Sequence, residues 1–412
     1  MRYYLFLFLW LFSFNSANAE VLNVNKNGKL NSIKAAIAQA KNGDTIFVSA
    51  GIYTEGNIII QKSISLIGKD YPTLDGKMKY ELLTIAAKHV RVEGFRIINS
   101  GRSSMEDLSG INCLDAHYVI IRNNILENTF FGIHLSNTNY CLIENNTLHA
   151  KAAHEYELGN GIHLWKCNNA SILKNKISGH RDGIYFEFVT FSAIIGNNSF
   201  KNMRYGLHFM FSNDDRYEYN TFSNNGAGVA VMYSSHVRMY RNNFSNNWGA
   251  SAYGLLLKDI RDSEVLRNNF TGNTSGIYME GTSRTEFENN YFHQNGWALK
   301  LQASCDENTF TKNNFTGNTF DISTNSILVL NKIDSNYWDK YQGYDLNKDG
   351  AGDIPYYPVN LFSMIVERVP ASMMLWRSFL VLLLDNAEKI VPAITPENLK
   401  DHQPSMKKYD HN

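Results

Sequence analysis

The sequence predicts an all-β fold, a right-handed parallel β-helix, and three observations support this prediction. A short phrase recurs about every 22 residues, a period typical of solenoids: residues 206–209 (GLHF) and 220–222 (NTF) are followed by 228–231 (GVAV) and 242–244 (NNF). Within each phrase, apolar and polar residues alternate with the period of two that β-strands require. Asparagine is frequent but proline is rare, with 7 in 412 residues, which favours stacked short strands over helices.

The first 19 residues have the features of a cleavable signal peptide. Arg2 gives a positive start, residues 3–14 form an apolar core too short to span a bilayer, and residues 17–19 (ANA) fit the small-x-small cleavage rule. We therefore expect an exported mature chain that starts at Glu20. The alternative is an uncleaved anchor, which is disfavoured because no stop-transfer pattern follows.

Charge, motifs and cysteines narrow the functional classes. The 39 basic and 39 acidic residues balance, so no strong attraction to nucleic acid is expected. No glycine-rich phosphate loop with a Lys-Ser/Thr pair occurs, which excludes nucleotide hydrolysis by that route. An exported chain can pair its cysteines, but their spacings share no multiple of the repeat, so mostly free thiols are expected. The cysteines are Cys113, Cys141, Cys167 and Cys305.

The segment after the signal peptide predicts a cap for the solenoid. Residues 31–41 (NSIKAAIAQAK) have the apolar stripe of a short amphipathic helix, with Asn31 or Ser32 as the candidate N-cap. Residues 44–48, 57–61 and 63–68 are apolar runs that predict three strands. Such a cap is expected because an uncovered first strand would otherwise pair with another chain.

From Leu82 onward the repeat becomes regular and predicts one turn of the β-helix per phrase. Most steps are 21 to 24 residues, and the coils that lead to Gly161 and Gly254 are longer. After each repeated glycine, the first and third residues are apolar and point inward, whereas the second and fourth point outward. The expected inward residues are Ile133, Leu135, Ile162, Leu164, Ile184, Phe186, Leu207, Phe209, Val229 and Val231.

Asparagines recur at one corner of the predicted turns, where stacking about 4.8 Å apart lets their amides bond from turn to turn. The expected ladder consists of Asn123, Asn145, Asn175, Asn197, Asn220, Asn242, Asn268, Asn289 and Asn313. An aromatic residue follows many of these asparagines and predicts an interior stack. Its expected members are Phe200, Phe222, Phe244, Phe270, Phe292 and Phe315.

The outward positions bring soft metal ligands to one face. The second position after the glycine holds His134, His163, Tyr185 and His208, and the fourth holds Trp165, Glu187, Met210 and Met232. Imidazole together with thioether sulfur suits Cu(I) rather than Mg²⁺ or Ca²⁺. We therefore predict a copper site at His208, Met210 and Met232, with His163 and His134 on the same face. The alternative is an apolar patch beneath a loop, and residues 150–160, which carry His154, are a candidate lid.

The competing class is a β-helix protein that binds or cleaves polysaccharides, similar to a lyase, hydrolase or epimerase. Such chemistry requires carboxylates or a basic residue clustered on one face. The candidates are Asp182, Asp214, Asp215 and Arg216, but no paired aspartate motif accompanies them. We therefore expect no sugar-cleaving activity.

The array is expected to end near Trp338, followed by an acidic loop. Asp345, Asn347, Asp349 and Asp353 occupy positions one, three, five and nine of a calcium-loop pattern with glycine at six. Tyr356 stands at position twelve, where the pattern has a bidentate Glu. The sequence thus allows either a weak structural Ca²⁺ site or a hydrogen-bonded acidic turn.

Residues 371–384 form an apolar segment interrupted by Arg377 and short for a membrane span. It is either a helix that caps the open end of the solenoid or a docking element for a membrane partner. The bulky candidates for docking are Met373, Met374, Leu375, Trp376 and Phe379. The tail at residues 395–412 is polar and is expected to be mobile.

The coil array, residues 343–358 (GYDLNKDGAGDIPYYP) and the apolar ending together resemble the NosD family. The resemblance implies a pectin-lyase-like β-helix at residues 20–338 and a C-terminal extension at 339–412. It also implies a periplasmic protein of denitrification that handles copper, or sulfur, for maturation of nitrous oxide reductase. The implied partners are an ABC-type permease with its cytoplasmic ATPase, a copper-chaperone lipoprotein and the reductase itself. No family motif fixes the copper ligands.

Overall fold

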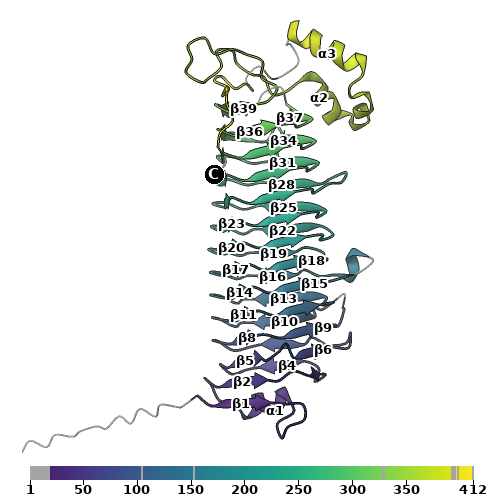
Figure 1. The fold of residues 1–412 in the computed structure, drawn as a ribbon, viewed down its shortest axis with the longest axis vertical. Coiled ribbons are helices and arrows are strands. Elements are labelled where there is room, and N and C mark those ends of the chain that lie inside the picture. Colours follow the sequence, from purple (N-terminus) through teal and green to yellow (C-terminus); the bar gives the residue numbers. More distant parts are fainter. Residues whose placement is uncertain are drawn as a thin grey trace, which may run out of the picture.

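The computed structural model describes residues 19–103, 105–151, 154–326, 330–390, 396 and 399–410 (Figure 1). The predicted signal peptide lies outside this part of the chain, except for Ala19. The chain winds into an elongated right-handed parallel β-helix, which confirms the predicted fold class (Figure 1). In the described ranges, no helix has the length and apolar character needed to cross a membrane.

Each turn contributes one strand to each of three parallel sheets, which run along the length of the solenoid. Sheet A contains β1 (Val21–Val24), β2 (Thr45–Val48), β5 (Ser65–Gly68), β8 (Arg91–Glu93), β11 (Ile120–Arg122), β14 (Leu142–Glu144), β17 (Ser171–Leu173), β20 (Ala193–Ile195), β23 (Arg216–Glu218), β26 (Arg238–Tyr240), β29 (Glu264–Leu266), β32 (Glu286–Glu288), β35 (Asp306–Thr311) and β38 (Leu330–Asp334).

Sheet B follows sheet A in each turn. It contains β3 (Ile52–Tyr53), β6 (Thr73–Asp75), β9 (Arg96–Ile98), β12 (Ile125–Glu127), β15 (Thr147–His149), β18 (Lys176–Ser178), β21 (Asn198–Phe200), β24 (Thr221–Ser223), β27 (Asn243–Ser245), β30 (Asn269–Thr271), β33 (Tyr291–His293), β36 (Asn314–Thr316) and β39 (Tyr337–Trp338).

Sheet C has the longest strands and holds the predicted copper ligands. It contains β4 (Ile58–Ile60), β7 (Leu83–Ile85), β10 (Ser109–Leu114), β13 (Phe131–Ser136), β16 (Ile162–Trp165), β19 (Ile184–Glu187), β22 (Tyr205–Met210), β25 (Ala227–Met232), β28 (Tyr253–Lys258), β31 (Ser275–Glu280), β34 (Trp297–Leu301) and β37 (Phe320–Thr324).

Helices close the two ends and one short helix lies on a loop (Figure 1). At the N-terminal end, α1 (Ile33–Gln39) buries Ile33, Ala36 and Ile37, and Ser32 is its N-cap because its side chain accepts a hydrogen bond from the backbone N–H of Ala35. The remaining helices are η1 (Glu155–Glu157), α2 (Leu361–Arg368), η2 (Pro370–Leu375) and α3 (Phe379–Ile390).

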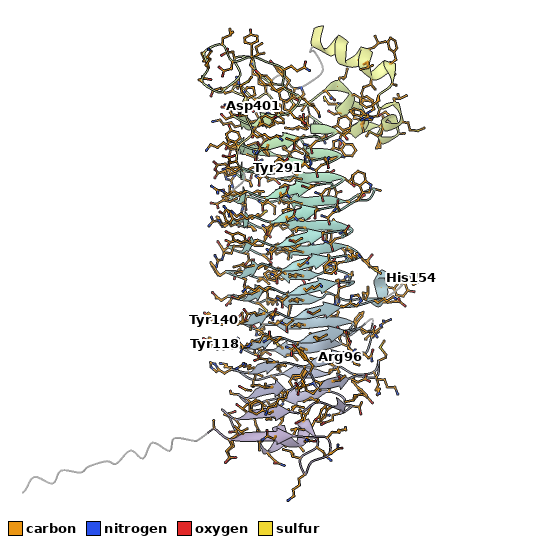
Figure 2. The ribbon with its side chains drawn as sticks, in the orientation of Figure 1. Arg96, Tyr118, Tyr140, His154, Tyr291 and Asp401 are labelled. Atoms are coloured by element: carbon orange, nitrogen blue, oxygen red, sulfur yellow. The ribbon has the colours of Figure 1, made fainter. Side chains whose placement is uncertain are left out.

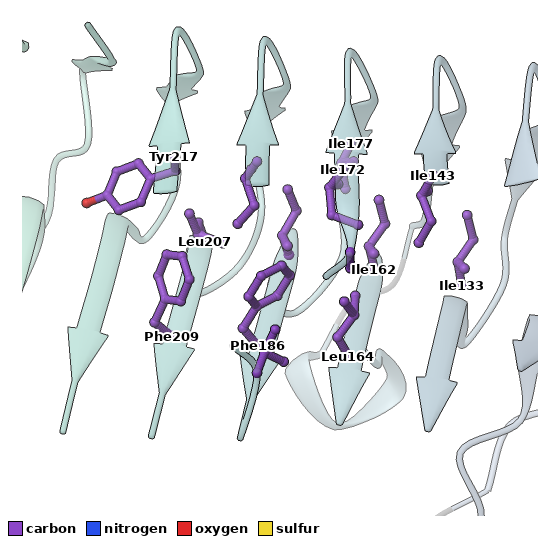
Figure 3. Close-up of a cluster of buried hydrophobic side chains, with 14 of the residues drawn as sticks. Ile133, Ile143, Ile162, Leu164, Ile172, Ile177, Phe186, Leu207, Phe209 and Tyr217 are labelled. Carbon is purple, nitrogen blue, oxygen red and sulfur yellow. The ribbon is translucent and has the colours of Figure 1, made fainter. Parts of the chain in front are cut away.

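The interior is filled as the alternation predicts, and every residue expected to point inward from sheet C is fully buried. Figure 3 shows such side chains from successive turns meeting in the interior, among them Ile133, Leu164 and Phe209. The repeated glycines allow the turns to approach closely. A Cβ at Gly132 or Gly228 would lie 2.3 Å from the carbonyl oxygen of the glycine in the next turn.

The asparagine ladder exists, but three of its predicted members are wrong by one residue. In the pairs at 123–124, 145–146 and 289–290, the second asparagine is buried and bonds to the next turn, whereas the first adopts a left-handed backbone at the corner. Each ladder amide donates to the next asparagine, and each Oδ1 accepts from the backbone N–H of the preceding one. The ladder runs through Asn124, Asn146, Asn175, Asn197, Asn220, Asn242, Asn268, Asn290, Asn313 and Asn336.

The aromatic stack is confirmed from Phe222 to Phe315 and continues to Trp338, with ring centroids 4.1–5.6 Å apart. Phe200 is the exception, because the inward position lies two residues after each ladder asparagine. In that turn the ladder residue is Asn197, so Ser199 points inward and Phe200 lies on the outer face.

The C-terminal tail, which its polar sequence predicts to be mobile, is instead packed on the last turns. Asp401 is fully buried and accepts hydrogen bonds from the backbone N–H of Asn336 at 2.8 Å and from Trp338 Nε1 at 2.9 Å (Figure 2). Tyr409 exchanges backbone hydrogen bonds with the side chain of Asn314. Asp401 therefore occupies the next position of the asparagine ladder and ends it.

Candidate metal-binding face

The outer face of sheet C carries a column of rings, which we call the imidazole column: His134, His163, Tyr185 and His208. Strand register places these residues directly beside one another on β13, β16, β19 and β22. Their ring centroids are 4.9 Å apart for His134–His163 and 4.8 Å apart for the next two pairs. The sequence therefore placed the three histidines on one face correctly.

These histidines face away from the solenoid interior but are not exposed, as an outward position would suggest. His134, His163 and His208 are only 9%, 9% and 6% exposed. His134 Nδ1 and both ring nitrogens of His163 and His208 are buried without a hydrogen-bond partner among the described residues. Buried polar atoms are normally satisfied, so these unpaired ring nitrogens set the face apart from the rest of the solenoid.

Burial also fixes the charge of two of these rings. It lowers the pKa of His134 and lowers that of His163 well below the usual value, because the low-dielectric surroundings disfavour the charged ring. Both imidazoles are therefore neutral near pH 7, and a neutral imidazole offers a nitrogen lone pair to a metal ion.

His208 lies beside a buried carboxylate that the sequence suggested only for sugar chemistry. His208 Nδ1 is 3.8 Å from Asp182 Oδ2, and Asp182 is almost completely buried. Arg204 Nε is 3.9 Å from Asp182 Oδ1 and 3.6 Å from Glu155 Oε1. The repeat did not indicate this neighbour, because the period of two assigns Asp182, two places before the inward Ile184, to the interior.

Met210 and Met232 are directly adjacent in register on β22 and β25, and both are half-buried. Tyr185 donates a hydrogen bond to Met210 Sδ at 3.6 Å. Met210 is two residues from His208 on the same face, so the two side chains are roughly 7 Å apart along the strand. The sequence did not foresee that Tyr185 links the imidazole column to the thioether pair.

In the part of the chain that the structure describes, no three His, Cys, Asp or Glu side chains converge on one point where a metal ion could bind. All four cysteines, which lie within that part, are free and buried. This face does bring imidazole and thioether side chains together, and Cu(I) accepts ligands of these soft kinds.

Residues 154–160 of the loop predicted as a lid lie beside this face. Leu158 is buried, Glu155 pairs with Arg204, and His154 stacks on Tyr156 at the edge of the molecule (Figure 2). A cavity of about 570 Å³ opens beside it, lined by Ser103, Asp107, Phe130, Phe131, Glu155, Tyr156, Leu158 and Arg181. The Phe131 ring lies 5.8 and 5.7 Å from the His134 and His163 rings, so one residue of the cavity lining contacts the imidazole column.

The acidic residues considered for sugar chemistry do not form a common site. Asp182 precedes β19, whereas Asp214 and Asp215 lie in the turn after β22, at the other end of the sheet C strands. Asp215 is buried and accepts a hydrogen bond from the backbone N–H of Ser192 at 2.7 Å. Asp214 lies 3.4 Å from His236, and Arg216 lies 3.7 Å from Glu218.

The acidic loop forms a hydrogen-bonded turn. Asp345 accepts hydrogen bonds from the backbone N–H groups of Asp349 and Gly350, and Asn347 accepts one from that of Asp349. Asp353 accepts one from the backbone N–H of Leu346. These oxygens are used within the loop, so the structure supports the acidic turn and not the calcium site.

The apolar C-terminal segment divides into a packed part and an exposed part. Met373 and Trp376 pack against a cluster of Phe320, Phe362, Val366 and Val381 that covers the last strand of sheet C. Met374 and Phe379 are 90% and 75% exposed, and Leu375, Leu380, Leu382 and Leu383 are also exposed. The segment therefore contributes to the cap and also presents an apolar surface.

Residues 149–347 match a protein family described as "Periplasmic copper-binding protein (NosD)". The chain is 27% identical over 383 residues to the "Probable ABC transporter binding protein NosD" of Pseudomonas aeruginosa, covering 87% of both chains. It is 26% identical over 378 residues to the protein of the same name from Stutzerimonas stutzeri, covering 87% of this chain and 86% of the relative. These matches confirm the resemblance to NosD.

Solved structures confirm the fold. The A-module of the Azotobacter vinelandii mannuronan C-5 epimerase AlgE6 is similar with a TM-score of 0.53 and 13% identity, over 78% of this chain and all of that one. A family 28 exopolygalacturonase from Yersinia enterocolitica gives a TM-score of 0.51 and 11% identity, over 79% of this chain and 80% of that one.

Proposed function

We propose that this chain, which matches the NosD family over residues 149–347, is a periplasmic accessory protein that binds Cu(I) transiently. It passes the ion on for assembly of the copper centre of nitrous oxide reductase. The description of the family as copper-binding and the name of the relatives as transporter binding proteins support this role.

The observation that carries the proposal is the imidazole column beside the thioether pair. Imidazole nitrogens buried without partners in the described structure are costly unless a ligand occupies them at some stage. Two of the rings are held neutral by burial, and soft Cu(I) favours neutral imidazole and thioether ligands.

The arrangement supports a path for the ion rather than a single deep site. Met210 and Met232 are half-buried, so they meet an incoming ion first, and His208 lies next to them on β22. His163 and His134 continue the column toward the cavity beneath the loop. Weak sites spaced along one face release the cargo more readily than one closed site does. Asp182 Oδ2 lies 3.8 Å from His208 Nδ1, so its negative charge favours a cation bound at His208.

Anaerobic Cu(I) titration of the mature chain, in competition with a chromogenic chelator, tests the site. The triple variant His208→Ala, Met210→Ala and Met232→Ala is expected to lose about tenfold or more in affinity. A double variant of the surface residues His236 and Met203 controls for the general loss of a histidine and a methionine. Equal affinities of the two variants would place the copper site elsewhere.

We further propose that the exposed face of α3 seats the solenoid on an ABC-type permease, which works with a cytoplasmic ATPase. Leu382 and Leu383 extend the apolar surface formed by Met374, Leu375 and Phe379, and large exposed apolar patches mark interaction sites. Met373 and Trp376, which were also predicted to dock, instead hold this helix on the cap.

Replacing Phe379, Leu382 and Leu383 by serine should leave the β signature in circular dichroism unchanged. Co-purification with the permease should then be lost, because these side chains supply the apolar contact. Leu346→Ser is the control, because this leucine on the acidic turn is at least as exposed as the three replaced residues. Retained co-purification of the triple variant would move the contact away from α3.

The copper-chaperone lipoprotein and the reductase are proposed as donor and acceptor of the ion. We also infer that the chain does not cleave sugars, because Asp182 is separated from Asp214 and Asp215 and glycoside cleavage requires paired carboxylates. Turnover of polygalacturonate, alginate or pectate by the pure chain, abolished in Asp182→Asn, would contradict this inference.

A further inference from the structure

A second groove lies on the outer face of sheet C, next to the C-terminal helices and apart from the imidazole column. Its volume is about 480 Å³, within the range of about 300–1,000 Å³ that is usual for ligand sites. One wall is the loop that precedes β28, which is one of the two longer coils of the repeat array, and the other is formed by α2 and η2. No copper-site candidate lines this groove, whose lining lies within the described residues.

Aromatic rings dominate the groove. Trp248 on the loop is 67% exposed, and Tyr253 and Tyr278 lie below it with ring centroids 5.2 Å apart. The loop is held in place, because the backbone of Gly249 exchanges two 3.0 Å hydrogen bonds with the hydroxyl of Thr274. An exposed tryptophan on an anchored loop forfeits the free energy that burial of its ring would give, which points to a ligand that covers it.

One end of the groove is polar but carries no net charge. Lys300 Nζ lies 3.0 Å from Glu367 Oε2 and 4.2 Å from the centroid of the Trp297 ring. Trp297 Nε1 is buried without a hydrogen-bond partner in the described ranges. A ligand seated here can satisfy this donor and bond to the ion pair without bringing a charge of its own.

We propose that this groove binds a neutral oligosaccharide. The C–H face of a sugar ring stacks on aromatic rings, while its hydroxyl groups bond to phenol, indole and charged side chains. A neutral sugar fits better than a uronate, because Glu367 already neutralises Lys300. Glu367 is the one carboxylate among the described lining residues, so the groove binds a sugar without the paired carboxylates that cleavage needs.

Calorimetric titration of the mature chain with cellohexaose, chitohexaose, maltohexaose and a mannuronate hexamer tests this site. We expect one of the neutral hexamers to bind with a Kd below about 1 mM. Trp248→Ala should weaken that binding by about tenfold, through loss of the stacked ring. Trp165→Ala, a half-buried tryptophan on β16, is the matched control and should bind the hexamer as the unmodified chain does.

Three results would overturn the proposal: no binding of any neutral hexamer, tighter binding of the mannuronate hexamer, or equal affinities of the two tryptophan variants. Trp248 lines neither the imidazole column nor the cavity beside it, so Cu(I) affinity should be the same in Trp248→Ala and the unmodified chain. The saccharide site and the copper site can therefore fail independently.

Discussion

The asparagine ladder and the imidazole column are built by the same parallel register, yet one is saturated with hydrogen bonds and the other is not. Asn146 donates from Nδ2 to Asn175 Oδ1 and to the carbonyl oxygen of Ile121, each at 3.0 Å, and its Oδ1 accepts two hydrogen bonds from Asn124. His163 is just as regularly stacked, but its two ring nitrogens find no partner among the described residues.

This difference separates structural from functional repetition. A ladder that satisfies every polar atom stabilises the fold, because leaving any one atom unpaired in the interior is costly. Ring nitrogens without hydrogen-bond partners add nothing to the free energy of unfolding of the protein without a ligand. The imidazole column therefore lacks the stabilising hydrogen bonds of the ladder, and this is what the proposed copper path requires of it.

The largest expected effect comes from breaking the asparagine ladder. Asn146→Ala removes the side-chain partner of the Asn124 backbone N–H, the Asn124 amide and the Ile121 carbonyl, whereas Asn175 Oδ1 keeps its bond from the backbone N–H of residue 146. The free energy of unfolding should therefore fall by about 3–5 kcal/mol. Urea unfolding followed by circular dichroism measures this loss.

The neighbouring residue Asn145 is the matched control, because it is exposed and adopts a left-handed backbone. Asn145→Ala should cost about 1 kcal/mol or less, from the backbone conformation that alanine disfavours. Equal losses in the two variants would mean that the ladder hydrogen bonds do not carry the stability assigned to them.

The same pair of residues shows what the sequence can and cannot predict. The period of about 22 and the alternation of two fix the fold, the inward residues and the face of the copper candidates, because each follows from strand geometry alone. An Asn-Asn pair is ambiguous, because either residue suits a corner. In most turns the ladder member lies two places before an apolar residue that fills the interior. At residues 197–200 the interior residue is Ser199 and not Phe200, so this rule alone does not select the ladder member.

The sequence also did not predict that the outward-facing histidines of sheet C are buried. The histidines are covered by neighbours from other turns and by a loop with its own contacts, and no local pattern reports such contacts. The sequence likewise did not predict the contact of the tail, in which Asp401 accepts the hydrogen bond that the next ladder asparagine would accept, 65 residues after Asn336. Polar composition predicted a mobile tail because it carries no information about a partner so distant in sequence.

The second largest expected effect on stability concerns His180, which lies at the start of a stack of asparagine amides. The backbone N–H of His180 donates to Asn202 Oδ1 at 3.2 Å, so His180 begins a second asparagine ladder that continues through Asn225 and Asn247. Burial lowers the pKa of His180 to about 3. In the unfolded chain this histidine has the ordinary pKa of about 6.5, so the unfolded chain binds the proton first as the pH falls. The contribution of neutral His180 to stability is therefore full above about pH 6.5 and is lost as the pH falls toward 3.

At pH 5 this histidine should therefore cost about 2 kcal/mol of stability relative to pH 7.5, at about 1.4 kcal/mol for each pH unit below 6.5. His180→Asn removes the titrating group and supplies the amide that the ladder uses, so its stability should depend less steeply on pH. Urea midpoints measured between pH 5 and 7.5 check this. Parallel pH profiles of the two chains would show that His180 titrates normally in the fold.

A smaller effect is expected where a carboxylate stands in the ladder position of an amide. Burial raises the pKa of Asp401, although hydrogen bonds from Trp338 and Asn336 oppose the shift. The folded state thus holds the proton more tightly, so the contribution of this group is full below about pH 4 and is lost as the pH rises through its folded pKa. Asp401→Asn should destabilise the chain at pH 7.5 by about 1 kcal/mol, because both carboxylate oxygens accept N–H groups and an amide NH2 in place of one oxygen cannot accept them. Asp410→Asn, in the same tail, is the control. An Asp401→Asn chain that is as stable as the unmodified chain would mean that burial of the charge costs as much as these hydrogen bonds contribute.

The smallest effect on stability is expected in the imidazole column, and it is the sharpest test of the comparison. His163→Phe keeps an aromatic ring between His134 and Tyr185 and removes two nitrogens that have no partner in the described part of the chain. Replacing an unsatisfied polar group by an apolar one of similar shape is nearly neutral or stabilising, so the free energy of unfolding at pH 7.5 should change by less than about 1 kcal/mol. Cu(I) affinity of the same variant should nevertheless fall, because one imidazole ligand of the path is gone.

Phe131→Leu, which changes the ring stacked on His163 without removing a ligand, is the control for packing. A loss of several kcal/mol in His163→Phe, with unchanged Cu(I) affinity, would show that this column is structural after all, like the asparagine ladder.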